Sequence, residues 1–336
     1  MLPYIVILGI RFPTYSLMIG VGALAFLIYY LTFVVKKEKI DRITSNRIVF
    51  SGVLGFIVLG VSAFIFNAIF HSIEEGELVV GGITWLGGVI GLIPAMLYLI
   101  HYFVPKERGN EINRLSTLLP GVVIAHAFGR LGCFFGGCCY GGPTDSWLGV
   151  VFPAGSSAGY AYPNINSEPH TVGEGDDIRT IYESLPVLPT QLIEALFEIL
   201  LFVVMIVLYK KLKHHNIEIY CFVYGTFRFI LEFWRGDDRG NTGFALSPSQ
   251  LMSIILFIFA ALLILYRKGI IFKSLAKKSE VWREVAKTAP AGGTSPFMNN
   301  SQRATNTIKE LHKLKEDGVI TEEEFEEKKK ELLKRI

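Results

Sequence analysis

Long apolar segments separated by short polar ones make up most of the first 266 residues of the chain. Each apolar segment is about as long as a helix that crosses a bilayer, which needs about 20 predominantly apolar residues. The pattern therefore predicts an all-α, polytopic membrane protein with seven transmembrane helices. These segments lie near residues 13–35, 48–71, 82–104, 115–136, 190–209, 217–234 and 247–266.

Other parts of the chain do not follow this pattern. Residues 137–189 are polar and rich in turn-forming residues, which predicts an extracytoplasmic head region. Residues 267–305 are first basic and then rich in Pro, Gly, Ser and Asn, as in a flexible linker. Within residues 306–336, apolar positions at helical spacing flank an Asp-Gly turn, which predicts a small cytoplasmic helical hairpin. We therefore expect a membrane domain over residues 1–266, then a linker, then this hairpin.

The basic residues are divided unequally between the loops. Three loops hold between three and five Lys or Arg residues each, whereas the two loops on the other side of the predicted membrane hold none or one. Basic loops stay in the cytoplasm, so the pattern predicts an outer N-terminus and a cytoplasmic C-terminus. The basic loops are 36–47, 105–114 and 210–216, and the others are 71–81 and 137–189.

The composition agrees with a membrane protein and excludes an ordinary soluble enzyme. Hydrophobic residues make up 51% of the chain, charged residues 19%, and the mean hydropathy is +0.42. The net charge of +3 is small, and no nucleic-acid partner is expected. The N-terminus has neither a basic start nor a small-residue cleavage site, so we expect an uncleaved first span.

The end of the fourth apolar segment carries unusual chemistry in the stretch HAFGRLGCFFGGCCYGG, residues 126–142. An arginine at membrane depth is costly, which indicates a function for Arg130. His126 lies four residues earlier and shares a helix face with it. Two simpler interpretations stay open. Arg130 could snorkel to the interface, and His126 could be a buried imidazole that bonds a neighbouring helix.

The sixth segment carries a second charged group, with Arg228, Glu232 and Arg235 at helical spacing on one face. Such residues turn towards the interior of a helix bundle and pair with one another. Arg130 and Arg228 together could clamp a phosphate by bidentate hydrogen bonds, and the most abundant phosphate in a membrane belongs to phospholipid. The alternative is a buried Arg–Glu pair that only fixes helix packing.

Two further polar residues lie near the predicted outer surface. Tyr15 begins the first segment, where its phenol could donate a hydrogen bond to a lipid headgroup or simply belong to an interfacial aromatic belt. Gln191 follows a predicted N-cap, Thr190, and shares a helix face with Glu194. A glutamate entering a membrane helix indicates a polar interior or a bond between helices.

Three of the four cysteines, Cys133, Cys138 and Cys139, cluster in the glycine-rich stretch. Their spacing does not match a known zinc motif, and too few other donors lie nearby in the sequence. We therefore expect no metal site and no redox role, and interpret the cysteines as small residues that pack close backbones.

Several motifs together resemble those of the prolipoprotein diacylglyceryl transferases over roughly residues 10–266. They are GRLGCFFGGCCYGG at 129–142, LPTQLIEAL at 188–196 and YGTFRFILEFWRGDD at 224–238. The resemblance implies transfer of the diacylglyceryl group from phosphatidylglycerol to the lipobox cysteine of a prolipoprotein in the bacterial inner membrane. Glycerol phosphate leaves, and no cofactor is expected. The tail at 306–335 resembles the short helical module called SHOCT.

The resemblance also assigns site residues. It implies that Arg130 and Arg228 match the two key arginines of the family, with His126 as the nearest candidate base. The residues expected to bind substrate are Tyr15, Gly141, Gln191, Glu232 and Arg235.

The chain departs from the family pattern at informative positions. Leu86 stands where the third-segment motif usually has an aromatic residue or a histidine. Cys133 replaces an asparagine and Cys138 replaces a glutamate of the better-known signature. Either His126 therefore supplies the base or no side chain does. A non-catalytic paralogue that binds anionic phospholipid or lipoprotein is the alternative function. A transporter would need an internal repeat, which is not seen, and a thiol oxidoreductase would need redox-active cysteines.

Overall fold

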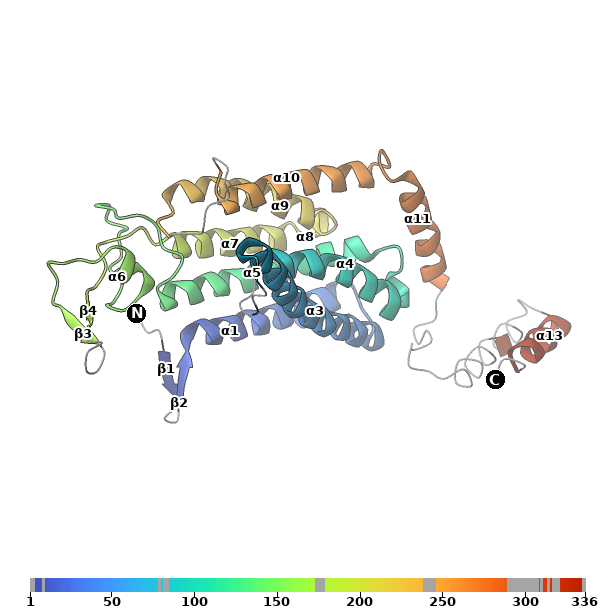
Figure 1. The fold of residues 1–336 in the computed structure, drawn as a ribbon. Coiled ribbons are helices and arrows are strands. Elements are labelled where there is room, and N and C mark those ends of the chain that lie inside the picture. Colours follow the sequence, from blue (N-terminus) through green and yellow to red (C-terminus); the bar gives the residue numbers. More distant parts are fainter. Residues whose placement is uncertain are drawn as a thin grey trace. The chain divides into compact units, whose positions relative to one another are not determined.

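The structure is a computed structural model that is almost entirely helical (Figure 1). It describes residues 4–7, 10–77, 80, 85–172, 179–237, 246–288 and 321–333, together with Ile308, Leu311, His312 and Lys315. The chain divides into two compact units. The first contains Met1–Ile40 and Ile112–Ala276, and the second contains Asp41–Glu111 and Lys277–Ile336.

The first unit is a helix bundle with a small head. An antiparallel hairpin of β1 (Tyr4–Ile7) and β2 (Ile10–Pro13) leads into α1 (Thr14–Ile28), which continues through the π-helical η1 (Tyr29–Val34) into α2 (Val35–Lys37). The other long helices are α5 (Glu111–Gly136), α7 (Thr190–Val207), α9 (Asn216–Leu231) and α10 (Pro248–Arg267). Two short helices, α8 (Tyr209–Leu212) and the 3-10 turn η4 (Glu232–Trp234), follow α7 and α9.

Small residues allow the helices of this bundle to approach closely. A Cβ atom added to Gly22 of α1 would lie 2.8 Å from the carbonyl oxygen of Ala125 on α5. About one turn further along this contact, Gly121 faces the rings of Phe26 and Tyr29, and the Tyr29 hydroxyl donates to the Thr117 carbonyl at 2.8 Å. Such contacts are typical of helix packing in membranes, where close approach gains van der Waals contact.

The head is a folded region between α5 and α7. It contains α6 (Ser157–Ala161) and an antiparallel hairpin of β3 (His170–Val172) and β4 (Arg179–Ile181). Its core is formed by Tyr140, Phe152, Ala158 and Val187, all buried. The predicted polar region 137–189 is therefore a packed structure with its own core in the residues that are described.

The second unit is built on the pair α3 (Arg42–Glu75) and α4 (Trp85–Phe103), followed by the 3-10 turn η2 (Pro105–Glu107). Asp41 caps α3, since its side chain accepts from the Thr44 amide. Burial slightly opposes ionisation of Asp41, but hydrogen bonds from Lys106 and Thr44 outweigh this and lower its pKa to about 2. Glycines again bring the two helices together, because a Cβ on Gly91 would meet the Ser62 side chain.

The basic part of the segment after α10 contains a helix, α11 (Lys273–Thr288), that the sequence pattern did not predict. The expectation of a flexible linker after it stays a prediction. Trp282 of α11 packs edge-on against His101 and lies under the guanidinium of Arg108, which explains why the helix is stable there. Residues 289–307 lie outside the described residues. At the end of the chain, α13 (Glu322–Leu333) matches the second helix of the expected hairpin.

The helices confirm a polytopic membrane protein. Among the described residues, five helices are long and apolar enough to cross a bilayer. The apolar part of α4, Gly87–Phe103, is shorter, and α9 has 16 residues and ends next to charged side chains. The five are Thr14–Lys37, Arg42–Ile69, Glu111–Gly136, Thr190–Val207 and Pro248–Arg267.

Candidate active site

Polar residues repeat every four positions on three neighbouring helices of the first unit, so each set occupies one helix face. The three faces meet in a single cluster of hydrogen bonds and ion pairs. Three of its members are buried and the other four are partly buried, which is unusual for charged side chains unless they are paired. The cluster contains His126 and Arg130 on α5, Glu194 and Glu198 on α7, and Tyr220, Tyr224 and Arg228 on α9.

Arg130 lies at the centre of this cluster. Its Nε is 3.3 Å from Oε1 of Glu194 and donates a hydrogen bond to Nε2 of His126 at 3.2 Å. Tyr224 donates to the same Glu194 oxygen at 2.9 Å. Both of these contacts use Nε. The side chain is 20% exposed, so it is not fully enclosed by the cluster.

His126 bridges Arg130 to a second glutamate. Its Nδ1 is 2.8 Å from Oε1 of Glu198, and the Tyr220 hydroxyl lies 3.3 Å from the same nitrogen. The other ring nitrogen accepts from Arg130. Both nitrogens are thus engaged by side chains of the cluster. These contacts fit the packing alternative, and a role of His126 as the base stays a prediction.

Arg228 is held between two oxygens. Its Nη1 is 2.6 Å from Oε2 of Glu232, and its Nη2 donates to the Ser249 hydroxyl on α10 at 2.7 Å. The Arg228–Glu232 pair expected from the spacing is therefore present. Glu194 is in direct contact with Arg130, and its carboxylate also interacts electrostatically with Arg228. A shared role of the two arginines stays a prediction.

The helical spacing predicted that Arg235 shares a face with Arg228 and Glu232, but the structure places it elsewhere. The α-helix ends at Leu231, and after the 3-10 turn the backbone at Arg235 is extended. Arg235 instead forms a two-point contact with Asp237, with donor distances of 2.8 and 2.7 Å. Burial alone would lower the pKa of Arg235, but the hydrogen-bonded Asp237 raises it, so the guanidinium stays charged.

The glycine-rich stretch forms a tight loop after α5. Gly137 and Cys139 have φ values of +68° and +65°, in the left-handed region that favours glycine. The start of α7 holds this loop, since Gln191 donates to the Cys138 carbonyl at 2.7 Å and Thr190 donates to the Cys139 carbonyl at 2.8 Å. Gln191 is fully buried. Gln191 therefore holds the loop through this buried hydrogen bond. Its direct contact with substrate stays a prediction.

Gly141 lies where three backbone segments meet. Its amide donates to the Leu188 carbonyl at 2.8 Å, and it pairs with Arg235 as an isolated β-bridge. A Cβ atom there would lie 2.7 Å from the Trp234 carbonyl oxygen and 2.8 Å from that of Leu188. Only glycine fits, because these neighbours are backbone atoms that cannot rotate away. Gly141 joins the head to the end of α9.

We predict that Gly141→Ala destabilises the protein by about 1–3 kcal/mol or more, because the new methyl overlaps two carbonyl oxygens. Gly142→Ala is the matched control, since a Cβ on Gly142 meets no atom within 4 Å. Thermal unfolding of the two purified variants in detergent measures the difference. Equal melting temperatures for both variants would contradict the close junction.

Tyr15 lies at the same end of the bundle. Its ring packs on Gly132, where an added Cβ would be 3.1 Å from Tyr15 Cδ2. The phenol interacts electrostatically with Arg130 and with the three clustered cysteines, and 43% of the residue is exposed. Tyr15 therefore borders the arginine site while remaining accessible.

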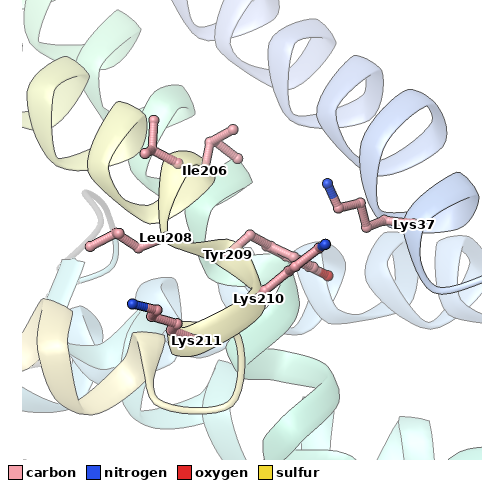
Figure 2. A pocket seen from close by; sticks show the side chains of 7 residues that line it. Lys37, Ile206, Leu208, Tyr209, Lys210 and Lys211 are labelled. Atoms are coloured by element: carbon pink, nitrogen blue, oxygen red, sulfur yellow. The ribbon is translucent and has the colours of Figure 1, made fainter.

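Among the described residues, the first unit has hollows at the head and at the opposite end of α7. One, of about 450 Å³, lies beside Arg235 where the head meets the end of α9. The other, of about 240 Å³, lies between α2 and α8 and is bordered by Lys37, Tyr209, Lys210 and Lys211 (Figure 2). Near this second hollow, Lys213 and Tyr209 both bond Glu38. The first hollow is bordered by Arg235, a predicted site residue. The second is bordered by lysines of the basic loops that are predicted to be cytoplasmic.

The sequence pattern did not identify three members of the cluster, Glu198, Tyr220 and Tyr224, or the Arg228 partner Ser249. Glu198 nevertheless follows Glu194, and Tyr224 follows Tyr220, at a spacing of four. A search for polar residues repeated at this spacing within apolar helices would have found three of them.

Comparisons with known proteins point to one family. A family model described as prolipoprotein diacylglyceryl transferase matches residues 3–266, and one described as short C-terminal domain, SHOCT, matches residues 306–333. The chain is 29% identical over 268 residues to phosphatidylglycerol-prolipoprotein diacylglyceryl transferase 2 of Clostridium perfringens, covering 76% of this chain and 91% of that protein. It is 29% identical to the transferase of Clostridium tetani, covering 74% and 91%, and 30% identical to that of Stenotrophomonas maltophilia, covering 55% and 61%.

Proposed function

The chain belongs to the prolipoprotein diacylglyceryl transferase family, and from this premise we propose that it transfers the diacylglyceryl group of phosphatidylglycerol to the lipobox cysteine thiol of a prolipoprotein. The observation that carries the proposal is the buried cluster in which Arg130 and Arg228 surround Glu194. A protein does not maintain such charges at membrane depth without a use for them. The family match and the chemistry of the cluster therefore support the same reaction.

Arg130 and Arg228 bind the phosphodiester of phosphatidylglycerol in this proposal. The Nη groups of Arg130 donate hydrogen bonds to the phosphate. Glu232 and Ser249 hold the guanidinium of Arg228 in its orientation. The acceptor sulfur attacks the glyceryl carbon next to the phosphate, the carbon–oxygen bond breaks, and glycerol phosphate leaves with the electron pair. Charge grows on the departing oxygen, and two guanidinium groups in a site of low dielectric stabilise it.

The remaining site residues are assigned by position. Tyr15, half exposed beside Arg130, donates its phenol to the lipid headgroup. Glu232 orients Arg228, and Arg235 borders the hollow at the head, where the glycerol end of the headgroup fits. Gln191 and Gly141 act through the loop and the junction that they hold together.

His126 has a positioning role in this proposal, since it links Arg130 to Glu198. A glutamine at this position can accept from Arg130 and donate to Glu198, but it cannot take up a proton. We therefore predict that His126→Gln keeps turnover within about tenfold of the parent, whereas His126→Ala loses about a hundredfold because Arg130 is no longer held in place.

Turnover of both variants between pH 6 and pH 9, relative to the parent, is the measurement. The ratio is expected to be independent of pH. A His126→Gln variant that loses a hundredfold at low pH and recovers as the pH rises would identify the imidazole as the base instead.

We also propose that the protein crosses the inner membrane seven times, with an outer N-terminus and a cytoplasmic C-terminus. The five long apolar helices support this, together with the shorter α4 and α9 and the unequal distribution of basic residues. The SHOCT region then lies in the cytoplasm, where it self-associates or binds a partner.

This topology predicts opposite labelling of two introduced cysteines. A membrane-impermeant maleimide added to intact cells is expected to label Ser157→Cys in the head but not Ser295→Cys in the linker. The parent protein measures the background from its native cysteines. Labelling of Ser295→Cys before the cells are permeabilised would contradict the topology.

The function itself is testable in cells. A bacterium depleted of its own transferase accumulates unmodified prolipoprotein, and expression of this chain is expected to restore processing. If the protein reaches the membrane at a normal level and processing is not restored, the non-catalytic, lipid-binding alternative gains support.

A further inference from the structure

Three cysteine thiols lie together at the outer end of α5. The Sγ atoms of Cys133, Cys138 and Cys139 are all within 4.8 Å of one another. They are brought together by the loop that ends the helix. The amide of Cys138 donates back to the Cys133 carbonyl at 3.1 Å, and the positive φ values of Gly137 and Cys139 reverse the chain. The spacing of the cysteines along the sequence argued against a metal site. In the folded chain, however, their sulfur atoms are close enough to bind one ion.

The arrangement has the form of a metal site with three protein ligands. A tetrahedral zinc ion, with Zn–S bonds of about 2.3 Å, needs sulfurs about 3.8 Å apart, which small side-chain rotations provide here. Thiolates select soft or borderline cations such as zinc and Cu(I). Among the described residues, no His, Asp, Glu or further Cys joins the group. Structural zinc sites use four protein ligands, whereas sites with three keep a position open for a reactant.

The three thiols lie next to the arginine site, and this position suggests a role for them in the reaction. Arg130 interacts electrostatically with Cys133 and Cys139, and Arg235 with Cys139. The proposed phosphate site and the thiol group therefore share a border. In the proposed reaction the nucleophile is itself a thiol, which reacts only as a thiolate. Leu86 stands at the usual motif position, and both nitrogens of His126 are engaged by other side chains, so the imidazole is not free to take this proton.

We propose that Cys133, Cys138 and Cys139 bind one zinc ion, and that its fourth position takes the acceptor cysteine of the prolipoprotein as a thiolate beside Arg130. This inference rests on the proposed transferase function. A thiol that coordinates zinc is deprotonated outright, so the metal replaces a general base.

The chemical balance needs no oxidant or further reactant. On binding, the acceptor thiol displaces water from the fourth position and releases its proton to solvent. One sulfur lone pair then forms the bond to the glyceryl carbon, and the carbon–oxygen bond to phosphate breaks with its electron pair on the phosphate oxygen. The thioether product has no charge and is a much weaker ligand than the thiolate, so it leaves and the site is ready for the next acceptor.

Metal binding can be measured without turnover. The purified full-length protein, stripped with a chelator and kept in a thiol-free reductant, is titrated with Cd(II), whose thiolate complexes absorb in the ultraviolet. We expect a band that saturates at one equivalent, and zinc that displaces it. Each of Cys133→Ser, Cys138→Ser and Cys139→Ser is expected to weaken zinc affinity at least about tenfold to a hundredfold.

The matched control is Cys221→Ala, because Cys221 is buried on α9 and does not belong to the group. It is expected to keep the parent's band and affinity. A parent protein without a saturable band, or one whose band survives all three serine substitutions, would overturn the zinc site. The parent titration needs no variant, so a variant that misfolds does not obscure the result.

Activity separates this inference from the transferase function. Metal-free protein is expected to transfer at least about a hundredfold more slowly than the same protein with one equivalent of zinc, as for loss of a general base. If metal-free protein transfers at the full rate, the function stands and the role of zinc is wrong. If one zinc ion binds but neither form transfers, the metal site stands and the transferase function fails.

Discussion

Arg228→Ala is expected to abolish diacylglyceryl transfer, and Arg130→Ala to do the same. Each substitution removes a charged donor from the place where the departing phosphate accumulates charge. Loss of one such donor in a preorganised site costs about a hundredfold to a thousandfold in turnover. Here the cost is at the upper end, because the donors lie in a region that excludes water and the guanidinium makes two-point contacts.

Lysine variants make this prediction more specific. Arg228→Lys keeps the charge beside Glu232 but lacks the planar fork, so it is expected to restore little activity while keeping the fold. Arg179→Ala is the control, since Arg179 is exposed on β4, away from the cluster. Initial rates on phosphatidylglycerol and a lipobox peptide are the measurement, with thermal unfolding of each variant beside it. Near-normal turnover of Arg228→Ala would exclude the phosphate clamp.

Removing the carboxylate between the arginines should have the largest effect on stability. Glu194 is fully buried, pairs with Arg130 and accepts from Tyr224. Glu194→Ala leaves Arg130 without its counter-ion at membrane depth, and breaking such a buried pair costs about 3–5 kcal/mol. A large fall in the melting temperature of the purified protein is expected. Glu183→Ala, at an exposed position of the head, should change stability by no more than about 0.5 kcal/mol.

A double substitution tests whether the effect belongs to the pair. If Glu194 mainly neutralises Arg130, then Arg130→Ala with Glu194→Ala is less destabilising than the sum of the two single variants. Fully additive effects would show that the two side chains stabilise the fold independently, and the cluster would then lose its central link.

The sequence predicted the helices and the shared face of His126 and Arg130 well, because membrane cost and helical periodicity both act within one segment. The predicted segments 115–136 and 190–209 correspond to α5 and α7, and the shared face of His126 and Arg130 is confirmed by their hydrogen bond. Periodicity gives the polar face of each helix but does not say which faces meet. For that reason the links from Arg130 to Glu194 and from His126 to Glu198 could not be assigned.

Two features at the ends of helices could not be predicted from the sequence. The spacing of Arg235 assumed that the helix continued, but a 3-10 turn ends it at Trp234 and gives this arginine a separate partner, Asp237. The spacing of the cysteines was judged along the sequence, whereas a left-handed backbone at Gly137 and Cys139 folds the three sulfurs together. Such turns depend on single φ values, which an apolar pattern does not encode.

The central claim is that this cluster moves a diacylglyceryl group from a phospholipid to a thiol. The direct measurement incubates the purified protein with phosphatidylglycerol and a lipobox peptide, and follows the peptide and the released glycerol phosphate by mass spectrometry. The account predicts a peptide heavier by one diacylglyceryl group on its cysteine, and one glycerol phosphate for each modified peptide. An unmodified peptide in the presence of zinc and folded protein would contradict it, as would modification of a peptide whose cysteine has been replaced by serine.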